Sequence, residues 1–236
     1  RACRECAAII ETNATRAGRF RLCGVEARLV PNYPPLELLA EPAPTRKPVV
    51  AYTGLACRER GFDLLLEAFA RLAGALPEAR LLAIGDFDPR TGIEAWSRRF
   101  VRERGLEARV EFAGRLPYGR LLGRLRDCLC GVILFQPDRE NDYTGQPNKL
   151  FEFMGAGLGV IASGFPEMFG VVARHRCGWS VDPTNVEAIA ETLRRALGEP
   201  ARTQAAGLRG REAVLERYNW RVAETALLDV YREAGC

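Results

Sequence analysis

Short apolar runs alternate regularly with amphipathic segments from Pro48 onward, and this alternation constrains the fold more than any other feature of the sequence. The apolar runs have the length of buried strands, and the segments between them carry apolar residues at helical spacing. The predicted strands are residues 49–53, 80–84, 110–113, 132–135, 159–162 and 179–181. The predicted helices are residues 61–72, 93–103, 118–129, 147–156 and 166–173, followed by 185–197, 202–217 and 221–232. Such alternation is typical of an α/β fold, in which helices cover both faces of a parallel sheet.

Residues 146–164 form the most specific segment of this pattern, because they predict a helix, a tight turn and a short buried strand. Pro147 is placed like the first residue of the helix, where its fixed φ helps and its missing N–H costs nothing. Leu150 and Met154 then recur at helical spacing, and Gly155 ends the helix. Because a helix N-terminus presents unpaired amides and the positive end of a dipole, this one is a predicted anion site.

Three polar side chains accompany the start of this helix. Asn148 and Lys149 lie in its first turn, and Glu152 follows three to four residues later on the same face. Lys149 adds a cation to the predicted anion site. A phosphate near Asn148 and a hydroxylated ring near Glu152 would both be held.

Three successive predicted strands are followed by glycine, at Gly54, Gly85 and Gly114. Each glycine alone is typical of an ordinary turn. Ligands of open parallel sheets, however, lie outside the carboxyl ends of the strands, where glycine permits close approach of the backbone. Together with the helix that follows Gln146, the three glycines predict a cleft large enough for a nucleotide.

Residues 146–164 closely resemble the donor-binding signature of the retaining glycosyltransferases of family four, whose C-terminal half is a Rossmann-like domain of the GT-B fold. In that family the helix carries the second glutamate of a Glu-x7-Glu pair, which accepts hydrogen bonds from the ribose; Glu152 corresponds to it. Thr144 stands at the position of the first glutamate, so a hydroxyl or nearby backbone amides would take its place. Residues 158–160 stand where the family usually has a proline before the strand.

Two further loops carry the resemblance. The family binds the donor diphosphate with two cations after the first strand of the domain, and Arg60 matches the second of them. Leu55 occupies the place of the first, and Arg58 is the nearby cation that could substitute for it. The turn from Gly114 to Pro117 resembles the loop whose backbone pairs with the nucleobase, at Leu116.

The resemblance therefore implies a catalytic role for three residues, which are Arg60, Lys149 and Glu152. It implies donor contacts at Gly54, Gly85, Gly114, Leu116, Thr144, Gly145, Gln146, Pro147 and Asn148.

No metal or other cofactor is expected beside the nucleotide-sugar substrate. Asp86 and Asp88 form an Asp-x-Asp that precedes a proline, which favours a turn. The only histidine, His175, has no carboxylate–serine constellation around it and is expected in a solvated loop.

Proline-rich residues between the first 33 residues and the sheet pattern predict a linker. The resemblance then divides the chain into the tail of an N-terminal acceptor domain (1–33), a linker (34–47), a donor-binding domain (48–218) and a C-terminal helix that returns towards the N-terminal domain (219–236). In the first part, short strands are expected at 7–10 and 27–30, with a helix between them that Thr12 or Asn13 caps and Gly24 ends.

Composition narrows the kinds of ligand and of cellular compartment that suit the protein. A net charge of +4, carried almost entirely by arginine, suits attraction to anionic ligands or lipid headgroups and does not require nucleic acid. No apolar run approaches the roughly 20 residues that cross a bilayer. Cys23, Cys57, Cys128, Cys130 and Cys177 sit mostly in apolar patterns, as in a reduced cytosolic protein, and the Cys3-x-x-Cys6 pair has no second pair at zinc spacing.

The resulting expectation is the donor-binding half of an enzyme that transfers a sugar, with retention, from a nucleoside-diphosphate sugar to a glycan or lipid-linked acceptor. Such an enzyme is expected in bacterial polysaccharide biosynthesis, in the cytoplasm, with peripheral membrane association through a missing N-terminal domain. Without that domain the chain is expected to be inactive. A nucleotide-sugar epimerase of the same fold and a non-catalytic nucleotide-sugar-binding module are the alternatives.

Overall fold

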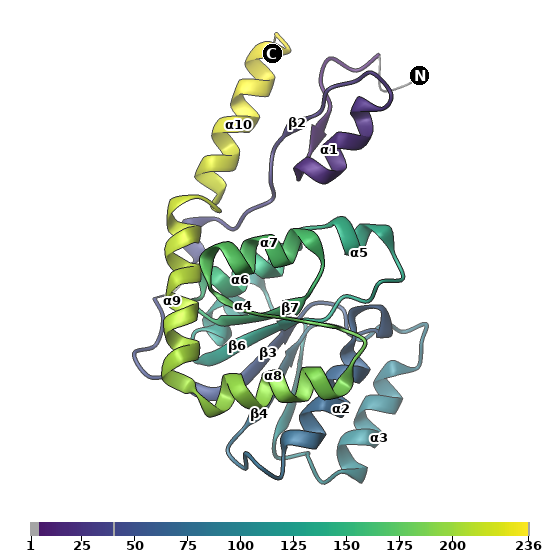
Figure 1. The fold of residues 1–236 in the computed structure, drawn as a ribbon, viewed down its shortest axis with the longest axis vertical. Helices are drawn as coiled ribbons and strands as arrows, with labels where there is room; N and C mark the ends of the chain where they lie inside the picture. Colours follow the sequence, from purple (N-terminus) through teal and green to yellow (C-terminus); the bar gives the residue numbers. More distant parts are fainter. Residues whose placement is uncertain (1–4, 40, 236) are drawn as a thin grey trace.

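Six parallel strands form the central sheet of the computed structural model, which describes residues 5–39 and 41–235 (Figure 1). Their order across the sheet is β5-β4-β3-β6-β7-β8. The chain thus runs outward from β3 to one edge, and then returns to the other side of β3 and builds towards the opposite edge. The strands are β3 (Lys47–Thr53), β4 (Arg80–Ile84), β5 (Val110–Gly114), β6 (Cys128–Ile133), β7 (Gly159–Ser163) and β8 (Gly178–Val181). A sheet of this order has its topological switch point between β3 and β6, outside whose carboxyl ends ligands bind.

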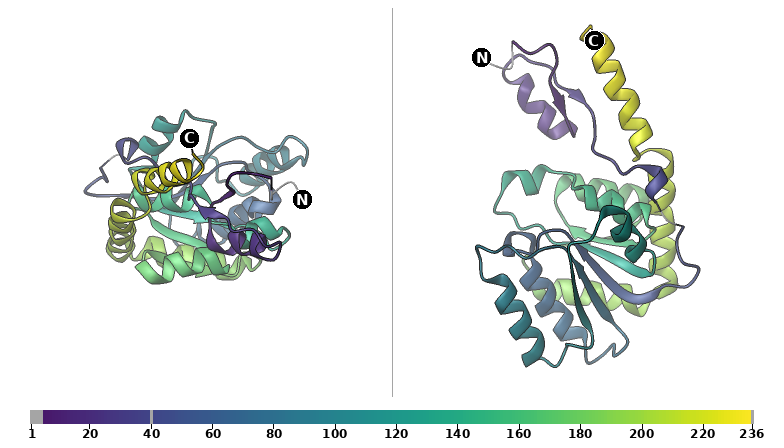
Figure 2. Two further views of the ribbon diagram at one scale, coloured as in Figure 1. Left: turned by 90° about the horizontal axis from the view of Figure 1, so that it is seen from above. Right: turned by 180° about the vertical axis from the view of Figure 1, so that it is seen from behind.

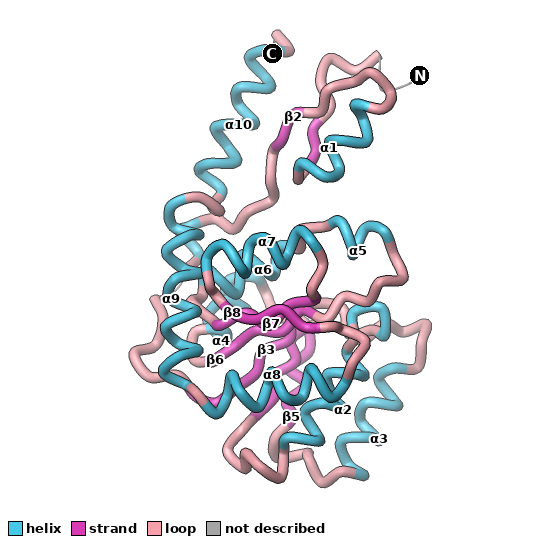
Figure 3. The backbone as a smooth tube through the Cα atoms, viewed as in Figure 1, coloured by secondary structure: helices cyan, strands magenta, loops and turns pink. Residues whose placement is uncertain are grey.

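Helices cover both faces of the sheet, as the alternation of apolar and amphipathic segments predicts (Figures 2 and 3). Successive residues of a strand point to opposite faces, so Val50 and Tyr52 belong to one core and Ala51 to the other. The first core lies under α2 (Phe62–Leu72), α3 (Ile93–Glu103) and α8 (Val186–Gly198). The second lies under α4 (Tyr118–Leu125), α6 (Asn148–Gly155), α7 (Pro166–His175) and α9 (Pro200–Glu216). The predicted α/β fold class is confirmed.

Two predicted boundaries on the second half of the sheet are wrong, and one short helix is absent from the prediction. Helix α4 ends at Leu125, not at residue 129, and β6 begins at Cys128, not at residue 132. All six residues of β6 are buried, and the polar pair before it, Arg126 and Asp127, lies in the break between helix and strand. The short helix α5 (Glu140–Thr144) is absent from the prediction, because five polar or exposed residues carry no apolar periodicity.

Pro147 is not the first residue of α6, as predicted, but its N-cap, with φ −71° and ψ 141°. The extended ψ places the first helical backbone at Asn148. Helix α6 therefore starts one residue later than predicted, and its first-turn amides lie at the predicted end of the sheet.

A small unit precedes the sheet and lies beside the C-terminal helix (Figure 1). It consists of α1 (Ala14–Arg21) and two short parallel strands, β1 (Ile10–Glu11) and β2 (Arg28–Leu29), which lie mostly inside or next to the expected segments. Asn13 caps α1 by accepting a hydrogen bond from the amide of Arg16. Helix α10 (Trp220–Glu233) meets this unit through an ion pair between Arg28 and Glu233.

Buried contacts fix the connecting segment, which includes the 3₁₀ turn η2 (Leu36–Leu38), against the sheet domain. The guanidinium of Arg46 is buried and donates to the carbonyls of Cys128 (2.7 Å) and Ala156 (2.6 Å). The ring of Tyr33 packs edge-on against Phe151 and Tyr218, with centroid distances of 4.7 and 5.4 Å. The linker is therefore part of the packed structure, and its last residue, Lys47, already belongs to β3.

Four of the five cysteines expected in the core, Cys57, Cys128, Cys130 and Cys177, are buried. Burial raises the pKa of each of these thiols. Cys23 is exposed, because it lies in the turn after α1, so its core assignment is wrong. Cys3 lies outside the described residues.

Candidate functional site

Gly54, Gly85 and Gly114 lie at one edge of the sheet, at the carboxyl ends of the adjacent strands β3, β4 and β5. All three have positive φ angles, of 99°, 141° and 66°. The amide of Gly54 donates to Ile84 O (2.8 Å), and that of Gly85 donates to Gly114 O (2.9 Å). A side chain on Gly85 would overlap the backbone of Gly54, so Gly85 packs beneath its neighbour.

Arg60 and Lys149 meet at Gly54, although 89 residues separate them in the sequence. A Cβ atom built on Gly54 would lie 3.2 Å from Nη1 of Arg60 and 3.3 Å from Nζ of Lys149. Two cations therefore converge on the open side of a residue without a side chain. This is the arrangement that a diphosphate requires, because both charges and the backbone can approach it together.

The position of Lys149 results from packing between α6 and the strands. Only 9% of the residue is exposed, and its ammonium group donates a hydrogen bond to the carbonyl of Thr53. Nζ also lies above the rings of Tyr52 and Phe135, at 4.9 and 5.5 Å from their centroids. Burial, followed by the nearby charge of Arg60, lowers the pKa of Lys149 to about 7. No carboxylate forms an ion pair with it in the described part of the chain.

The loop after β3 turns Arg60 towards this point. The 3₁₀ turn η3 (Arg58–Arg60) ends at Gly61, whose φ of 61° also makes it the N-cap of α2. A Cβ on Gly61 would lie 2.5 Å from Leu134 O, so the tight passage requires glycine. The guanidinium carbon of Arg60 lies 5.6 Å from the centroid of Phe135.

Arg58, the substitute for the missing first cation, lies elsewhere. It forms an ion pair with Asp63 (2.8 Å), and its guanidinium carbon lies 5.7 Å from the ring centroid of Trp96. Leu55 is partly buried and brings no charge to the site. The structure thus brings together one of the loop cations, Arg60, with Lys149 of α6.

Glu152 lies half-buried on α6, one helical turn after Lys149. Burial raises the pKa of Glu152, and the hydroxyl of Tyr118, the first residue of α4, and the charge of Lys149 oppose this rise. Leu116 packs against the second core, and Asn148 is exposed at the start of α6.

Residues 144–146 are held by protein partners. The hydroxyl of Thr144 donates to Glu140 O (2.8 Å) within α5, and its carbonyl accepts from Nδ2 of Asn13 (3.1 Å). Gly145 is buried against the backbone of α5. The side-chain amide of Gln146 (Nε2) donates to the carboxylate of Glu167 (2.8 Å).

Two other sequence features lie outside this site. Asp88 accepts hydrogen bonds from the guanidinium (2.8 Å) and the backbone amide (3.0 Å) of Arg90, which lower the pKa of Asp88 to about 2. The turn follows the Asp-x-Asp segment, at residues 89–92, and Phe87 within the segment forms an isolated parallel bridge with Ala56. His175 ends α7 and lies 3.0 Å from the hydroxyl of Tyr218, so its assignment to a solvated loop is wrong. The described residues contain no cluster of three or more metal-ligating side chains. In the same residues, no helix combines the length and apolar character that a bilayer crossing requires.

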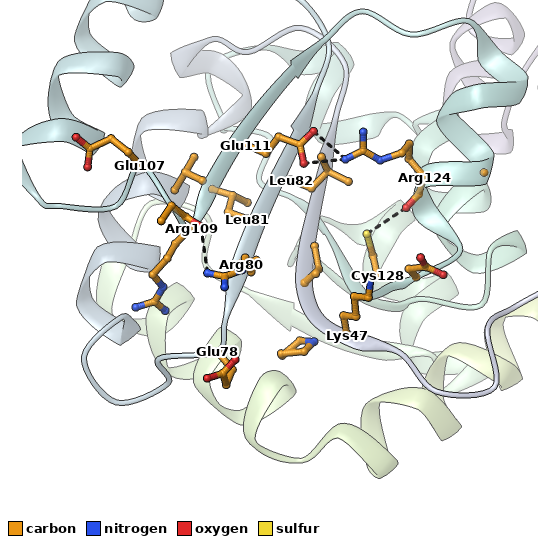
Figure 4. A pocket seen from close by; sticks show the side chains of 16 residues that line it. Lys47, Glu78, Arg80, Leu81, Leu82, Glu107, Arg109, Glu111, Arg124 and Cys128 are labelled. Carbon is orange, nitrogen blue, oxygen red and sulfur yellow. Dashed lines mark hydrogen bonds and ion pairs between the residues drawn. The ribbon is translucent and has the colours of Figure 1, made fainter.

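A groove of about 640 Å³ opens at the opposite edge, where β3, β4 and β5 begin (Figure 4). Two of its arginines have protein partners: Arg124 pairs with Glu111 (2.8 Å), and Arg109 donates to the backbone carbonyl of Ala79 (3.0 Å). The carboxyl edge instead has two cations that converge on one of its positive-φ glycines, Gly54, so it is the better candidate for an anionic ligand.

Sequence reasoning missed Tyr52 and Phe135, whose rings lie beside the ammonium group of Lys149. In the sequence both look like ordinary core residues, and only the pairing of β3 with β6 brings them to the same lysine.

Comparisons with known proteins show the family and the fold of the chain. The family model of "Glycosyl transferases group 1" matches residues 47–199. The chain is 28% identical over 171 residues to a 2-deoxystreptamine glucosyltransferase of Streptomyces kanamyceticus, covering 72% of this chain and 42% of that protein. It thus spans less than half of that relative's length.

Solved structures share the fold. The C-terminal domain of a glycosyl transferase group 1 family protein of Francisella tularensis aligns with a TM-score of 0.67 and 17% identity, over 78% of this chain and 98% of that domain. Anabaena HepE in complex with UDP and glucose aligns with a TM-score of 0.80 and 15% identity, over 98% of this chain and 64% of that chain. The match to a C-terminal domain confirms the predicted Rossmann-like GT-B half. The chain belongs to the group 1 glycosyl transferases.

Proposed function

We propose that this chain is the donor-binding half of a retaining glycosyltransferase that holds a nucleoside-diphosphate sugar at the carboxyl edge of its sheet. The observation that carries the proposal is the convergence of Arg60 and Lys149 on Gly54. The diphosphate would lie between these cations and the first-turn amides of α6, as anions do at helix N-termini. Support comes from Anabaena HepE, a protein of the same fold whose structure contains UDP and glucose.

Each group of the site has a role in this proposal. Arg60 and Lys149 stabilise the negative charge that develops on the diphosphate as the bond to the sugar breaks. Glu152 accepts hydrogen bonds from the ribose, while the backbone near Leu116 pairs with the base. Asn148 and the backbone of Gly145 lie near the sugar end. No metal ion is needed, because two side-chain cations and helix amides supply the positive charge.

The acceptor, a glycan or a lipid-linked glycan, would bind mainly to an N-terminal half that completes the cleft. The proposed setting is the cytoplasm of a bacterium, at the inner face of the membrane. One observation favours a different function, in which the module binds the nucleotide sugar without transferring it. Thr144, at the position of the family's first glutamate, directs its hydroxyl into the backbone of α5.

Calorimetric titration of the 236-residue chain with UDP and with GDP tests the proposed site. We expect saturable binding of at least one of them in the presence of EDTA, since the proposal needs no metal. The Arg60→Ala variant should bind that nucleotide about ten- to hundredfold more weakly, the scale of a lost charge-assisted hydrogen bond. Absence of binding by both nucleotides would contradict the proposal. With a full-length protein, transfer of labelled sugar to an acceptor separates an enzyme from a binding module, and conversion of the free sugar identifies an epimerase.

Donor affinity should fall as the pH rises through the pKa of Lys149, which is about 7 in the unliganded protein. Below this pH the ammonium group is charged and ready for the diphosphate, whereas above it each pH unit adds the cost of protonating the lysine, up to about tenfold in affinity. UDP-glucose is the suitable probe, because its two phosphates keep their charge in this range. We expect roughly 10- to 30-fold weaker binding at pH 8.5 than at pH 6, with proton uptake on binding. Equal affinity at both pH values would show that Lys149 does not contact the donor.

A further inference from the structure

The first turn of α1 contacts the segment that leads into α6, although 131 positions separate Asn13 from Thr144 in the sequence (Figure 1). Asn13 is 4% exposed, and its side chain has two roles. Its Oδ1 accepts a hydrogen bond from the amide of Arg16 (3.0 Å), which caps α1, and its Nδ2 donates to the carbonyl of Thr144 (3.1 Å). One buried side chain therefore joins the start of α1 to the end of α5.

Arg16 extends from the same turn of α1 to the next residue of the segment, Gly145. Its Nη2 atom donates to the carbonyl of Asn141 (3.3 Å) and to the side-chain oxygen of the same residue. A Cβ atom on Gly145 would lie 3.1 Å from this Nη2 atom and 2.5 Å from the carbonyl oxygen of Asn141. The guanidinium group therefore packs against the backbone of Gly145, on a side where no side chain fits.

A third residue of α1, Thr15, supports the segment through α7. Its hydroxyl donates to one carboxylate oxygen of Glu167, and the other oxygen accepts from Nε2 of Gln146 (2.8 Å). Each of the residues 144–146 is thus held from α1, either directly or through Glu167.

The start of α5 borders the proposed diphosphate site. Arg139, the N-cap of α5, forms an ion pair with Glu59 (3.5 Å), and Glu59 directly precedes Arg60. The end of α5 leads through residues 145–147 into α6, which carries Lys149. The segment therefore connects the two cations of the proposed site, and α1 fixes its second half.

The order of the strands indicates which part of the donor this segment would meet. The proposed nucleoside site is the turn after β5, and the proposed diphosphate site lies at Gly54, after β3. The sugar, bonded to the far phosphate, would continue away from β5 towards β6. The connection from β6 to α6 carries α5 and residues 144–146. Backbone amides and carbonyls at this point suit the hydroxyls of a sugar.

We propose that Asn13 and Arg16 are positioning residues for the sugar of the donor: they hold the backbone of residues 144–145 where it binds the sugar hydroxyls. The inference rests on the proposed function and adds to it two residues outside the sheet domain. Neither side chain need touch the donor, because both act through the backbone of the segment. Loss of either contact should therefore weaken the binding of a nucleotide that carries a sugar and spare the free nucleoside diphosphate.

The Asn13→Ser variant tests the inference, because serine is also a good N-cap for α1 but has no amide group for Thr144. UDP, UDP-glucose, UDP-N-acetylglucosamine, GDP and GDP-mannose are titrated into the wild type and the variant by calorimetry. For the sugar nucleotide that the wild type binds, we expect about five- to tenfold lower affinity in the variant, and a change of less than about twofold for the matching nucleoside diphosphate.

Asn219→Ser is the matched control, because Asn219 has the same two roles at the start of α10. Its Oδ1 accepts from the amide of Val222 (3.3 Å), and its Nδ2 donates to the carbonyls of Val214 (2.9 Å) and Leu215 (3.1 Å). It is 2% exposed, and its partners belong to α9 and α10. Thermal unfolding should show similar losses of stability for the two variants. The ratio of the two affinities in Asn219→Ser should equal that of the wild type.

A second variant, Arg16→Met, leaves the cap of α1 intact. Methionine has a helix propensity close to that of arginine, but it cannot donate to Asn141. We expect the same selective loss of affinity for the sugar nucleotide. Arg21→Met, at an exposed position in the last turn of α1, should bind like the wild type.

Hydrogen exchange of residues 140–146 shows whether each variant has loosened the segment. Faster exchange with an unchanged ratio of affinities would give these contacts a structural role only and overturn the inference. An equal loss of affinity for nucleoside diphosphate and sugar nucleotide would overturn it too, and so would a wild type that binds a nucleoside diphosphate but none of the sugar nucleotides. A wild type that binds no nucleotide at all would overturn the proposed function as well.

Discussion

Gly54→Ala is expected to weaken nucleoside-diphosphate binding at least a hundredfold, the largest effect that we expect from any single methyl group in the site. The added carbon would lie 3.2 Å from Arg60 Nη1 and 3.3 Å from Lys149 Nζ, on the side where the two cations meet. Lys149 has little room to move, because Thr53, Tyr52 and Phe135 surround its ammonium group. The methyl group would therefore occupy the space of the phosphate, and alanine would also be strained at a φ of 99°.

Gly92→Ala is the matched control for this variant. Gly92 precedes α3 with a φ of 65°, but a Cβ there would meet no atom within 4 Å. Both variants should lose about 1–2 kcal/mol of unfolding free energy, the cost of a left-handed backbone with a side chain. Urea unfolding measures this loss, and calorimetry with UDP or GDP measures binding. Only Gly54→Ala should lose affinity, and similar affinities for the two variants would remove Gly54 from the site.

The sequence predicts those parts of the site that depend on local pattern. The glycines after β3, β4 and β5 and the amphipathic helix α6 are visible as turn residues and helical spacing, and parallel topology places all of them at one edge. Contacts made across the fold are not visible in this way. Tyr52 and Phe135 surround Lys149 only because β3 pairs with β6. No residue near Lys149 in the sequence indicates that its side chain is buried.

Helix ends and short helices are also hard to predict from sequence, because backbone angles and contacts with distant residues decide them. Pro147 satisfies the rules for both the N-cap and the first helical residue, and only its ψ of 141° decides between them. Helix α5 has no apolar face of its own. Asn13, Arg16 and Arg19 of the distant N-terminal unit contact it, so local propensity could not reveal it.

Lys149→Met should separate stability from function at a single position. Methionine keeps the length and fits between Tyr52 and Phe135, but it has no charge for a diphosphate. Donor affinity should therefore fall about 30- to 150-fold, equivalent to about 2–3 kcal/mol for a charge-assisted contact, and its pH dependence between pH 6 and 8.5 should disappear. An unchanged affinity for UDP-glucose at pH 6 would rule out a role of Lys149 in donor binding.

Unfolding of the same variant should show that Lys149 lowers the unfolding free energy of the unliganded protein. Its pKa is lowered from 10.5 to about 7 by burial, so between these values the unfolded chain binds more protons than the folded one. Wild-type stability should thus decrease as the pH falls from about 10 to 7 and level off below. In Lys149→Met this slope should be absent from urea unfolding curves, with unfolding free energy at pH 6 equal to or above that of the wild type. Within the described residues Lys149 forms no ion pair with a carboxylate, and the proposed diphosphate would supply the negative charge that offsets its burial.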